Sequence, residues 1–225
     1  MRDMFSRPTD DVFLGGRNDA IELLKAWAGS TLAFAVVQTG ANNLLSIDFV
    51  TNLLISAVVC GLAFVLHELA HRVVARGYGA EAHFIADTRW LMISIVLAFV
   101  GFFIAAPGAV WHRGYLTPRQ SGLIALAGPV TNMVLSLLFL GALIGLAVIG
   151  ISLPDWLVTT CYIGFKFNAW IGLFNMIPAG PFDGAKVLNW DWRVFAVTVA
   201  VGLGLAFVLS DQALLTIIRS LRGLL

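Results

Sequence analysis

Long apolar stretches separated by short polar segments run along most of this 225-residue chain. A membrane-spanning helix needs about 20 predominantly apolar residues. We therefore predict spans over about 20–40, 47–74, 120–149, 154–177 and 194–209. The period-2 alternation of a membrane β-barrel is absent. The pattern predicts an all-α polytopic membrane protein with about five to six transmembrane helices.

The two ends of the chain add little to this picture. Segment 211–225 is apolar apart from a few residues that include Arg219 and Arg222, so it either lies in the membrane interface or forms a sixth span. Positions 1–16 are polar and lack the layout of a signal peptide. We interpret 1–225 as a single membrane-embedded domain.

Composition agrees with the membrane class. Hydrophobic residues make up 59% of the chain and charged residues 12%, against about 25% charged in soluble domains. The net charge of +1 offers no electrostatic basis for binding nucleic acid. Cys60 and Cys161 both lie in apolar stretches and match no zinc-finger or redox spacing.

A metal-binding pattern lies near the end of the second predicted span. His67 and His71 are four residues apart, so on a helix their imidazoles project from one face, with Glu68 beside them. Two such histidines can bind zinc while the glutamate acts as a base toward the water on the metal. Ionisable residues at membrane depth are costly and usually functional. The sequence therefore predicts a catalytic zinc site.

A catalytic zinc usually takes three protein ligands, and Asp183 is the best candidate for the third. It follows an apolar span within a stretch rich in proline and glycine. Non-helical backbone at membrane depth is tolerated only where protein or water surrounds it. An ordinary Asp-Gly turn is the alternative. Weaker candidates for the third ligand are Glu81, His83, His112 and Asp155.

Three motifs resemble the site-2 protease family of intramembrane zinc metalloproteases. They are the HELAH motif at 67–71, the AGPVTN segment at 127–132 and the NMIPAGPFDG segment at 175–184. They correspond to the family's HExxH, GPxxN and NxxPxxxxDG motifs. The resemblance covers the catalytic core, about 47–184. No PDZ or CBS domain is recognised, so it indicates a minimal member of the family.

The resemblance implies a role for each matching residue. One Zn2+ per chain would be held by His67, His71 and Asp183, with Glu68 as the catalytic base. Asn175 would assist substrate or oxyanion binding, and Asn132 is a second candidate for that role. An interhelical hydrogen bond is the alternative for both asparagines. The implied substrate is a transmembrane helix that is cut within the lipid bilayer.

The proposed ligands also constrain the topology. His67 and His71 lie near the end of one span and Asp183 follows the end of another, so these two spans must run in the same direction. An odd number of crossings must separate them, and 120–149 supplies one. We therefore predict that the apolar segment at about 88–112 is a non-crossing hairpin, bent at or near Pro107-Gly108.

Positive charges indicate on which side of the membrane the active site lies. Under the positive-inside rule, the arginines around the predicted hairpin indicate the cytoplasm. They are Arg72, Arg76, Arg89, Arg113 and Arg119. The sequence therefore predicts a multi-pass protein of the cell membrane whose active site faces the cytoplasm.

The predicted reaction is peptide-bond hydrolysis in regulated intramembrane proteolysis. Zinc-bound water would attack the scissile carbonyl with Glu68 as the general base. The alternative is a metal transporter, or a metal-binding protein that binds helices without proteolysis. A protease with glutamate as third ligand is disfavoured, because only Glu22 and Glu81 remain besides Glu68. Gly128-Pro129 is interpreted as a bend in its helix.

Overall fold

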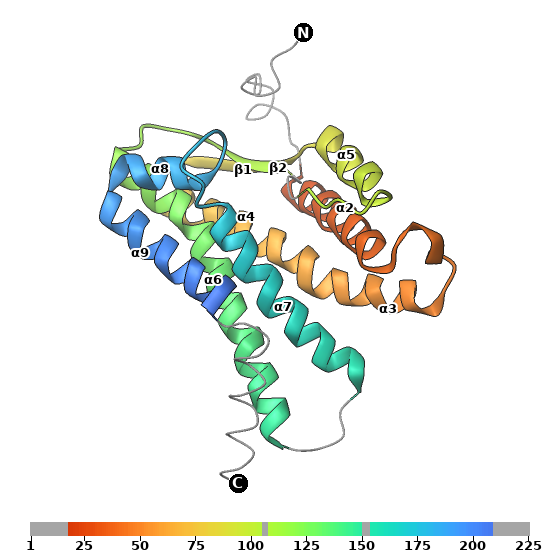
Figure 1. Cartoon of the computed structure of the whole chain (residues 1–225). Helices are drawn as coiled ribbons and strands as arrows, with labels where there is room; N and C mark the ends of the chain where they lie inside the picture. Colours follow the sequence, from red (N-terminus) through yellow and green to blue (C-terminus); the bar gives the residue numbers. More distant parts are fainter. Residues whose placement is uncertain (1–17, 105–107, 150–153, 209–225) are drawn as a thin grey trace.

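The computed structural model describes residues 18–104, 108–149 and 154–208 (Figure 1). Within these ranges, four helical segments are long and apolar enough to cross a membrane. They are α2 (Asp19–Thr39), the continuous segment Ile47–Gly77, α6 (Pro118–Ile149) and α7 (Asp155–Phe174). This confirms the all-α polytopic membrane class. The predicted sixth span at 211–225 lies outside the described residues.

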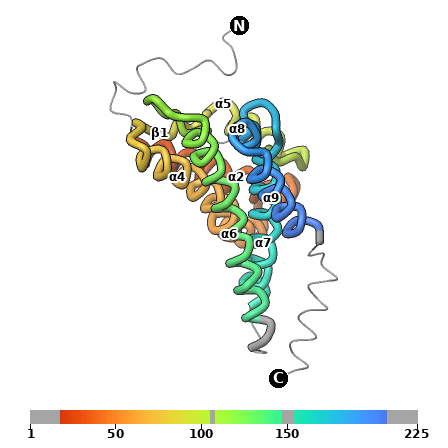
Figure 2. The backbone as a smooth tube through the Cα atoms, turned by 90° about the vertical axis from the view of Figure 1, so that its left-hand side faces the viewer, coloured from red at the N-terminus to blue at the C-terminus, as the bar shows by residue number. Residues whose placement is uncertain are grey.

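Shorter elements gather mainly at one end of the long helices. They are β1 (Glu81–Ala86), α5 (Thr88–Ala98), β2 (Gly108–Arg113) and α8 (Asp183–Trp190). The predicted fifth span at about 194–209 falls on α9 (Trp192–Leu203), which continues into the π-helical turn η3 (Gly204–Val208). Its described part is an apolar helix shorter than the four above. Figure 2 shows α6 and α7 running side by side, with α9 beside their upper part.

Polar side chains set where several helices begin. The Asn18 side chain accepts a hydrogen bond from the Ala20 N–H at the start of α2. The Ser46 hydroxyl accepts one from Phe49 at the start of α3 (Ile47–Ser56). These caps satisfy backbone N–H groups that have no partner within the helix. The short 3-10 turn η1 (Ala41–Asn43) connects α2 to α3.

The second spanning segment is interrupted by a π-helical turn. Helix α3 passes through η2 (Ala57–Gly61) into α4 (Leu62–Gly77). The Trp27 indole N–H donates to the carbonyl of Ala57 at 3.1 Å. The same indole lies against Gly61, where a Cβ would come within 2.3 Å of it. Helix α2 thus holds the turn that precedes the histidine-bearing helix.

The segment after α4 leaves the end of this helix and returns to it through a pair of strands. Strands β1 and β2 pair antiparallel, from Glu81 opposite Arg113 to Ala86 opposite Gly108. The chain between the strands therefore begins and ends at one place, and whether it crosses the membrane stays a prediction. The first strand precedes the predicted hairpin of about 88–112, and its residues Ala82, Phe84 and Ala86 are buried in alternation.

The predicted bend at or near Pro107-Gly108 falls largely outside the described residues. Gly108 is the first residue of β2, and Pro107 lies outside the described residues. Within the described residues, the chain turns at the end of α5, where Gly101 has a φ of +85° and the Phe102 N–H donates to the Leu97 carbonyl. A glycine with positive φ is a common way to end a helix and reverse the chain.

Close approach of α6 and α7 gives a test of the packing. A Cβ on Gly164 would lie 2.5 Å from the ring of Phe139. We expect Gly164→Ala to lower the free energy of unfolding by about 1–3 kcal/mol, because overpacking forces side chains from their preferred rotamers. Unfolding of the protein in detergent micelles measures the change.

Gly145→Ala is the matched control, since Gly145 lies in α6 and a Cβ there meets no atom within 4 Å. Equal stability of the two variants would contradict the close packing of α6 on α7.

Candidate metal centre

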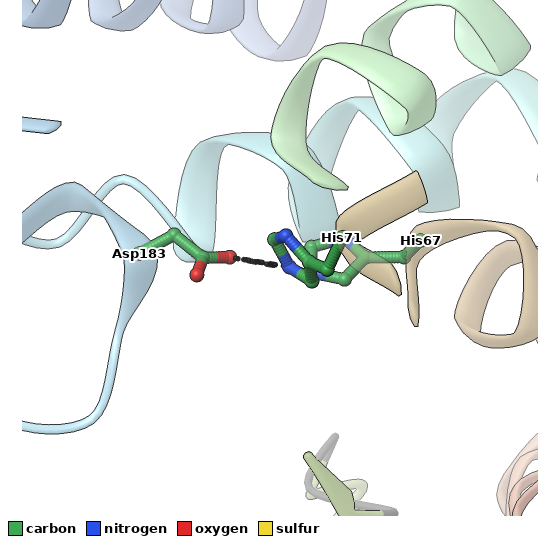
Figure 3. A group of neighbouring side chains, drawn as sticks. All are labelled: His67, His71 and Asp183. Atoms are coloured by element: carbon green, nitrogen blue, oxygen red, sulfur yellow. Dashed lines mark hydrogen bonds and ion pairs between the residues drawn. The ribbon is translucent and has the colours of Figure 1, made fainter. Parts of the chain in front are cut away.

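Two histidines of α4 form one half of the site. His67 and His71 are both buried and lie one helical turn apart. Their Nε2 atoms are 3.0 Å from each other. Figure 3 shows both rings pointing from the same helix toward one point. Two nitrogen lone pairs can therefore meet at a single ion.

Asp183 approaches from the opposite side. Its Oδ2 lies 3.3 Å from His67 Nε2 and 3.2 Å from His71 Nε2 (Figure 3). Asp183 is the first residue of α8, which follows the irregular segment after α7. The predicted parallel direction of the two spans is thus seen, because the ends of α4 and α7 meet at one site.

A backbone contact closes the segment that carries Asp183. The Gly184 N–H donates to the Asn175 carbonyl at 2.8 Å. A Cβ on Gly184 would lie 2.2 Å from the Met176 carbonyl oxygen, so only glycine allows this approach. This hydrogen bond therefore holds Asp183 close to the end of α7.

The three atoms fit a tetrahedral zinc site. Bonds of about 2.0–2.1 Å to nitrogen and oxygen place neighbouring ligand atoms about 3.3 Å apart in a tetrahedron. The observed separations are 3.0, 3.2 and 3.3 Å. Burial raises the pKa of the Asp183 carboxyl, but the two imidazoles outweigh it and hold that pKa well below its usual range. A charged carboxylate with two imidazoles suits a divalent cation and leaves one position open.

The outer nitrogens of both rings have oxygen partners. His67 Nδ1 lies 2.6 Å from Asn132 Oδ1, and His71 Nδ1 lies 2.7 Å from the Ile124 carbonyl oxygen. Both partner atoms are acceptors, so each Nδ1 carries the proton and each Nε2 presents its lone pair. This is the usual second contact of metal-binding histidines.

Helix α6 supplies the wall behind the histidines at Gly128. A Cβ on this residue would lie 2.4 Å from His67 Nε2 and 2.5 Å from His71 Nε2. The backbone of α6 would therefore border an ion held by the two imidazoles. The interpretation of Gly128-Pro129 as a helix bend missed this contact.

Glu68 is buried beside the ligands. Val110 of β2 lies close to its carboxylate. The hairpin that follows α4 thus reaches the predicted base. This places one edge of β2 at the site.

The two predicted asparagines occupy different positions. Asn132 is fully buried and bonds to His67 and to Asn168, which are the contacts of the interhelical alternative. Asn175 ends α7, and its side chain donates to the Ile171 carbonyl. A substrate or oxyanion contact of either residue stays a prediction. Sequence analysis missed Asn168, whose only signal is an amide within an apolar span.

The weaker candidates for the third ligand are not part of the group that the predicted ligands form. His83 bonds to Asp19, and Glu81 pairs with Arg113. Asp155 begins α7, at the end opposite Asp183. His112 lies in β2 near the site, where burial, Lys186 and His71 lower its pKa, but it is not part of the group that could hold a metal. Among the described residues, the one group that could hold a metal is His67, His71 and Asp183.

Comparison with known proteins identifies the family. MJ0611 of Methanocaldococcus jannaschii, named as a candidate zinc metalloprotease, is 42% identical over 154 residues, covering 68% of this chain and 76% of that protein. Rip3 of Mycobacterium tuberculosis, named likewise, is 32% identical over 151 residues. The match covers 67% of this chain and 34% of Rip3.

A third relative is YwhC of Bacillus subtilis, also named as a candidate zinc metalloprotease. It is 28% identical over 144 residues, covering 57% of this chain and 64% of YwhC. No family model and no solved structure matches the chain. The extent of the match to MJ0611 shows that the chain belongs to this family of zinc metalloproteases.

Gly128 provides a test of the site that leaves the proposed ligands in place. We expect Gly128→Ala to reduce bound metal strongly, because the added methyl group occupies the space of the ligand nitrogens. Metal content of the purified protein measures the effect.

Gly141→Ala in the same helix is the control, since a Cβ there meets nothing within 4 Å. Equal metal content in both variants would show that the ion does not lie against Gly128.

Proposed function

We propose that this chain is an intramembrane zinc protease of the site-2 protease class, which hydrolyses peptide bonds of transmembrane helices. The observation that carries this proposal is the group of His67, His71 and Asp183. Its three ligand atoms lie within 3.3 Å of one another. The two histidines lie on a helical segment long enough to cross a bilayer, and Asp183 follows another such helix, α7.

Zinc in this site would activate water and polarise the scissile carbonyl as a Lewis acid. Glu68 adjoins His67 in the chain and is positioned to accept a proton from the attacking water. It then delivers the proton to the leaving amine, as general acid–base catalysis requires. Asn175, at the end of α7, is our candidate for stabilising the oxyanion.

The substrate must present an extended backbone to this site. An intact helix engages its carbonyls in i→i−4 hydrogen bonds, so local unwinding precedes cleavage. The edge of β2 near Glu68 supports this step, because an extended segment can add to an open strand edge. Helix-breaking residues in the substrate therefore favour cleavage.

Charge supports a cytoplasmic orientation in the cell membrane. Arg72 and Arg76 of α4 both pair with Asp19 at the start of α2, at the same end of the helices as the site. Arg113 lies in β2 at that end. Under the positive-inside rule, this end faces the cytoplasm.

Substitutions of ligand and base separate metal binding from catalysis. We expect the wild-type chain to bind one zinc, which is lost in His67→Ala and in Asp183→Ala. Glu68→Gln retains zinc but cleaves nothing, because the amide cannot accept the proton. Zinc content and cleavage of a tagged transmembrane substrate in proteoliposomes measure the two properties.

Asp155→Asn is the control for Asp183, because Asp155 is exposed at the opposite end of α7. Full zinc retention in Asp183→Ala would overturn the ligand set. Cleavage by Glu68→Gln would overturn the mechanism, and zinc flux into vesicles without proteolysis would favour a transporter.

A further inference from the structure

A chain of hydrogen bonds leads from α7 through α6 to a proposed ligand. Asn168 Nδ2 donates to the Gly164 carbonyl at 3.0 Å. Asn132 Nδ2 donates to Asn168 Oδ1 at 3.0 Å and lies 3.3 Å from the Ala63 carbonyl oxygen. Asn132 Oδ1 in turn lies 2.6 Å from His67 Nδ1.

Each hydrogen bond in this chain allows only one assignment of donor and acceptor. The Gly164 carbonyl can only accept, so the amide nitrogen of Asn168 must face it and the oxygen must face Asn132. The Asn168 oxygen can only accept, so it must face the amide nitrogen of Asn132. The amide oxygen of Asn132 then faces His67. Both amides are fully buried, and water therefore cannot replace a missing partner.

The chain of bonds also decides which nitrogen of His67 can bind metal. An amide oxygen facing Nδ1 requires a proton there, because one member of the pair must donate. The lone pair of the neutral ring then lies on Nε2, toward Asp183 and His71. A reversed Asn132 would present N–H groups to Nδ1 and place the proton on Nε2.

We propose that Asn168 is a positioning residue of the metal centre: it holds Asn132 in the orientation that makes His67 Nε2 a ligand. Asn168 itself does not touch the ion. This inference rests on the proposed function, since it assigns the bound ion as zinc.

A neighbouring bond provides a matched control. Ser136 lies one turn beyond Asn132 on α6 and is also fully buried. Its hydroxyl donates to the Phe165 carbonyl of α7 at 2.9 Å. Both polar contacts join α6 to α7, but only that of Asn168 leads to His67. A loss of interhelical bonding alone would therefore affect both variants similarly.

The experiment measures zinc affinity by chelator competition on the full-length protein in detergent. We expect Asn168→Leu to weaken zinc binding about 10-fold to 100-fold, the usual effect of losing a second partner behind a ligand. Ser136→Ala is expected to retain wild-type affinity. The visible spectrum of the cobalt-substituted protein should shift in Asn168→Leu alone. If leucine prevents folding, Asn168→Ala carries the same expectation.

A rescue separates orientation from packing. In Asn168→Leu combined with Asn132→Asp, the carboxylate can only accept from His67 Nδ1, so its orientation no longer needs Asn168. Zinc affinity and the cobalt spectrum should return toward wild type. Equal affinities of Asn168→Leu and Ser136→Ala, or no rescue, would overturn the inference while the proposed function stands. A wild-type chain that binds no zinc would contradict the proposed function itself.

Discussion

The meeting of three side-chain atoms inside a helical bundle is the constraint on which this structure depends. His67 and His71 belong to one spanning segment, and Asp183 follows another more than 100 residues later. Their convergence requires α4 and α7 to end on the same side. It is therefore consistent with a hairpin that returns to the side where it began, and α6 is the one long apolar helix between them among the described residues.

Hydropathy and the convergence of the three side chains together account for most of what could be predicted from the sequence. Each long span is a continuous apolar run, which needs no tertiary information to be recognised. Asp183 could be chosen because few charged residues lie near the spans. The strand at 81–86 could not be recognised, because its pairing with β2 depends on residues far along the chain. The turn at Gly101 was obscured by the more conspicuous proline at 107.

The supporting residues of the site were the hardest to predict. Gly128 and Asn168 are single residues in apolar helices, and no periodic pattern distinguishes them from ordinary packing residues. Their significance comes from what lies opposite: the imidazoles for Gly128 and the Asn132 amide for Asn168. Such contacts link residues on different helices, so they emerge only when the helices are assembled.

The π-helical turn Ala57–Gly61 divides one membrane span into two helical phases. Each residue advances an α-helix by about 100°, so an extra residue in the turn rotates α4 relative to α3 by about that amount. One face of α3 can therefore lie against lipid and α2, while α4 turns the face that carries the histidines toward Asp183. Lengthening or shortening α3 by whole turns would leave the histidines aimed as they are, whereas removing one residue from the π turn would redirect them.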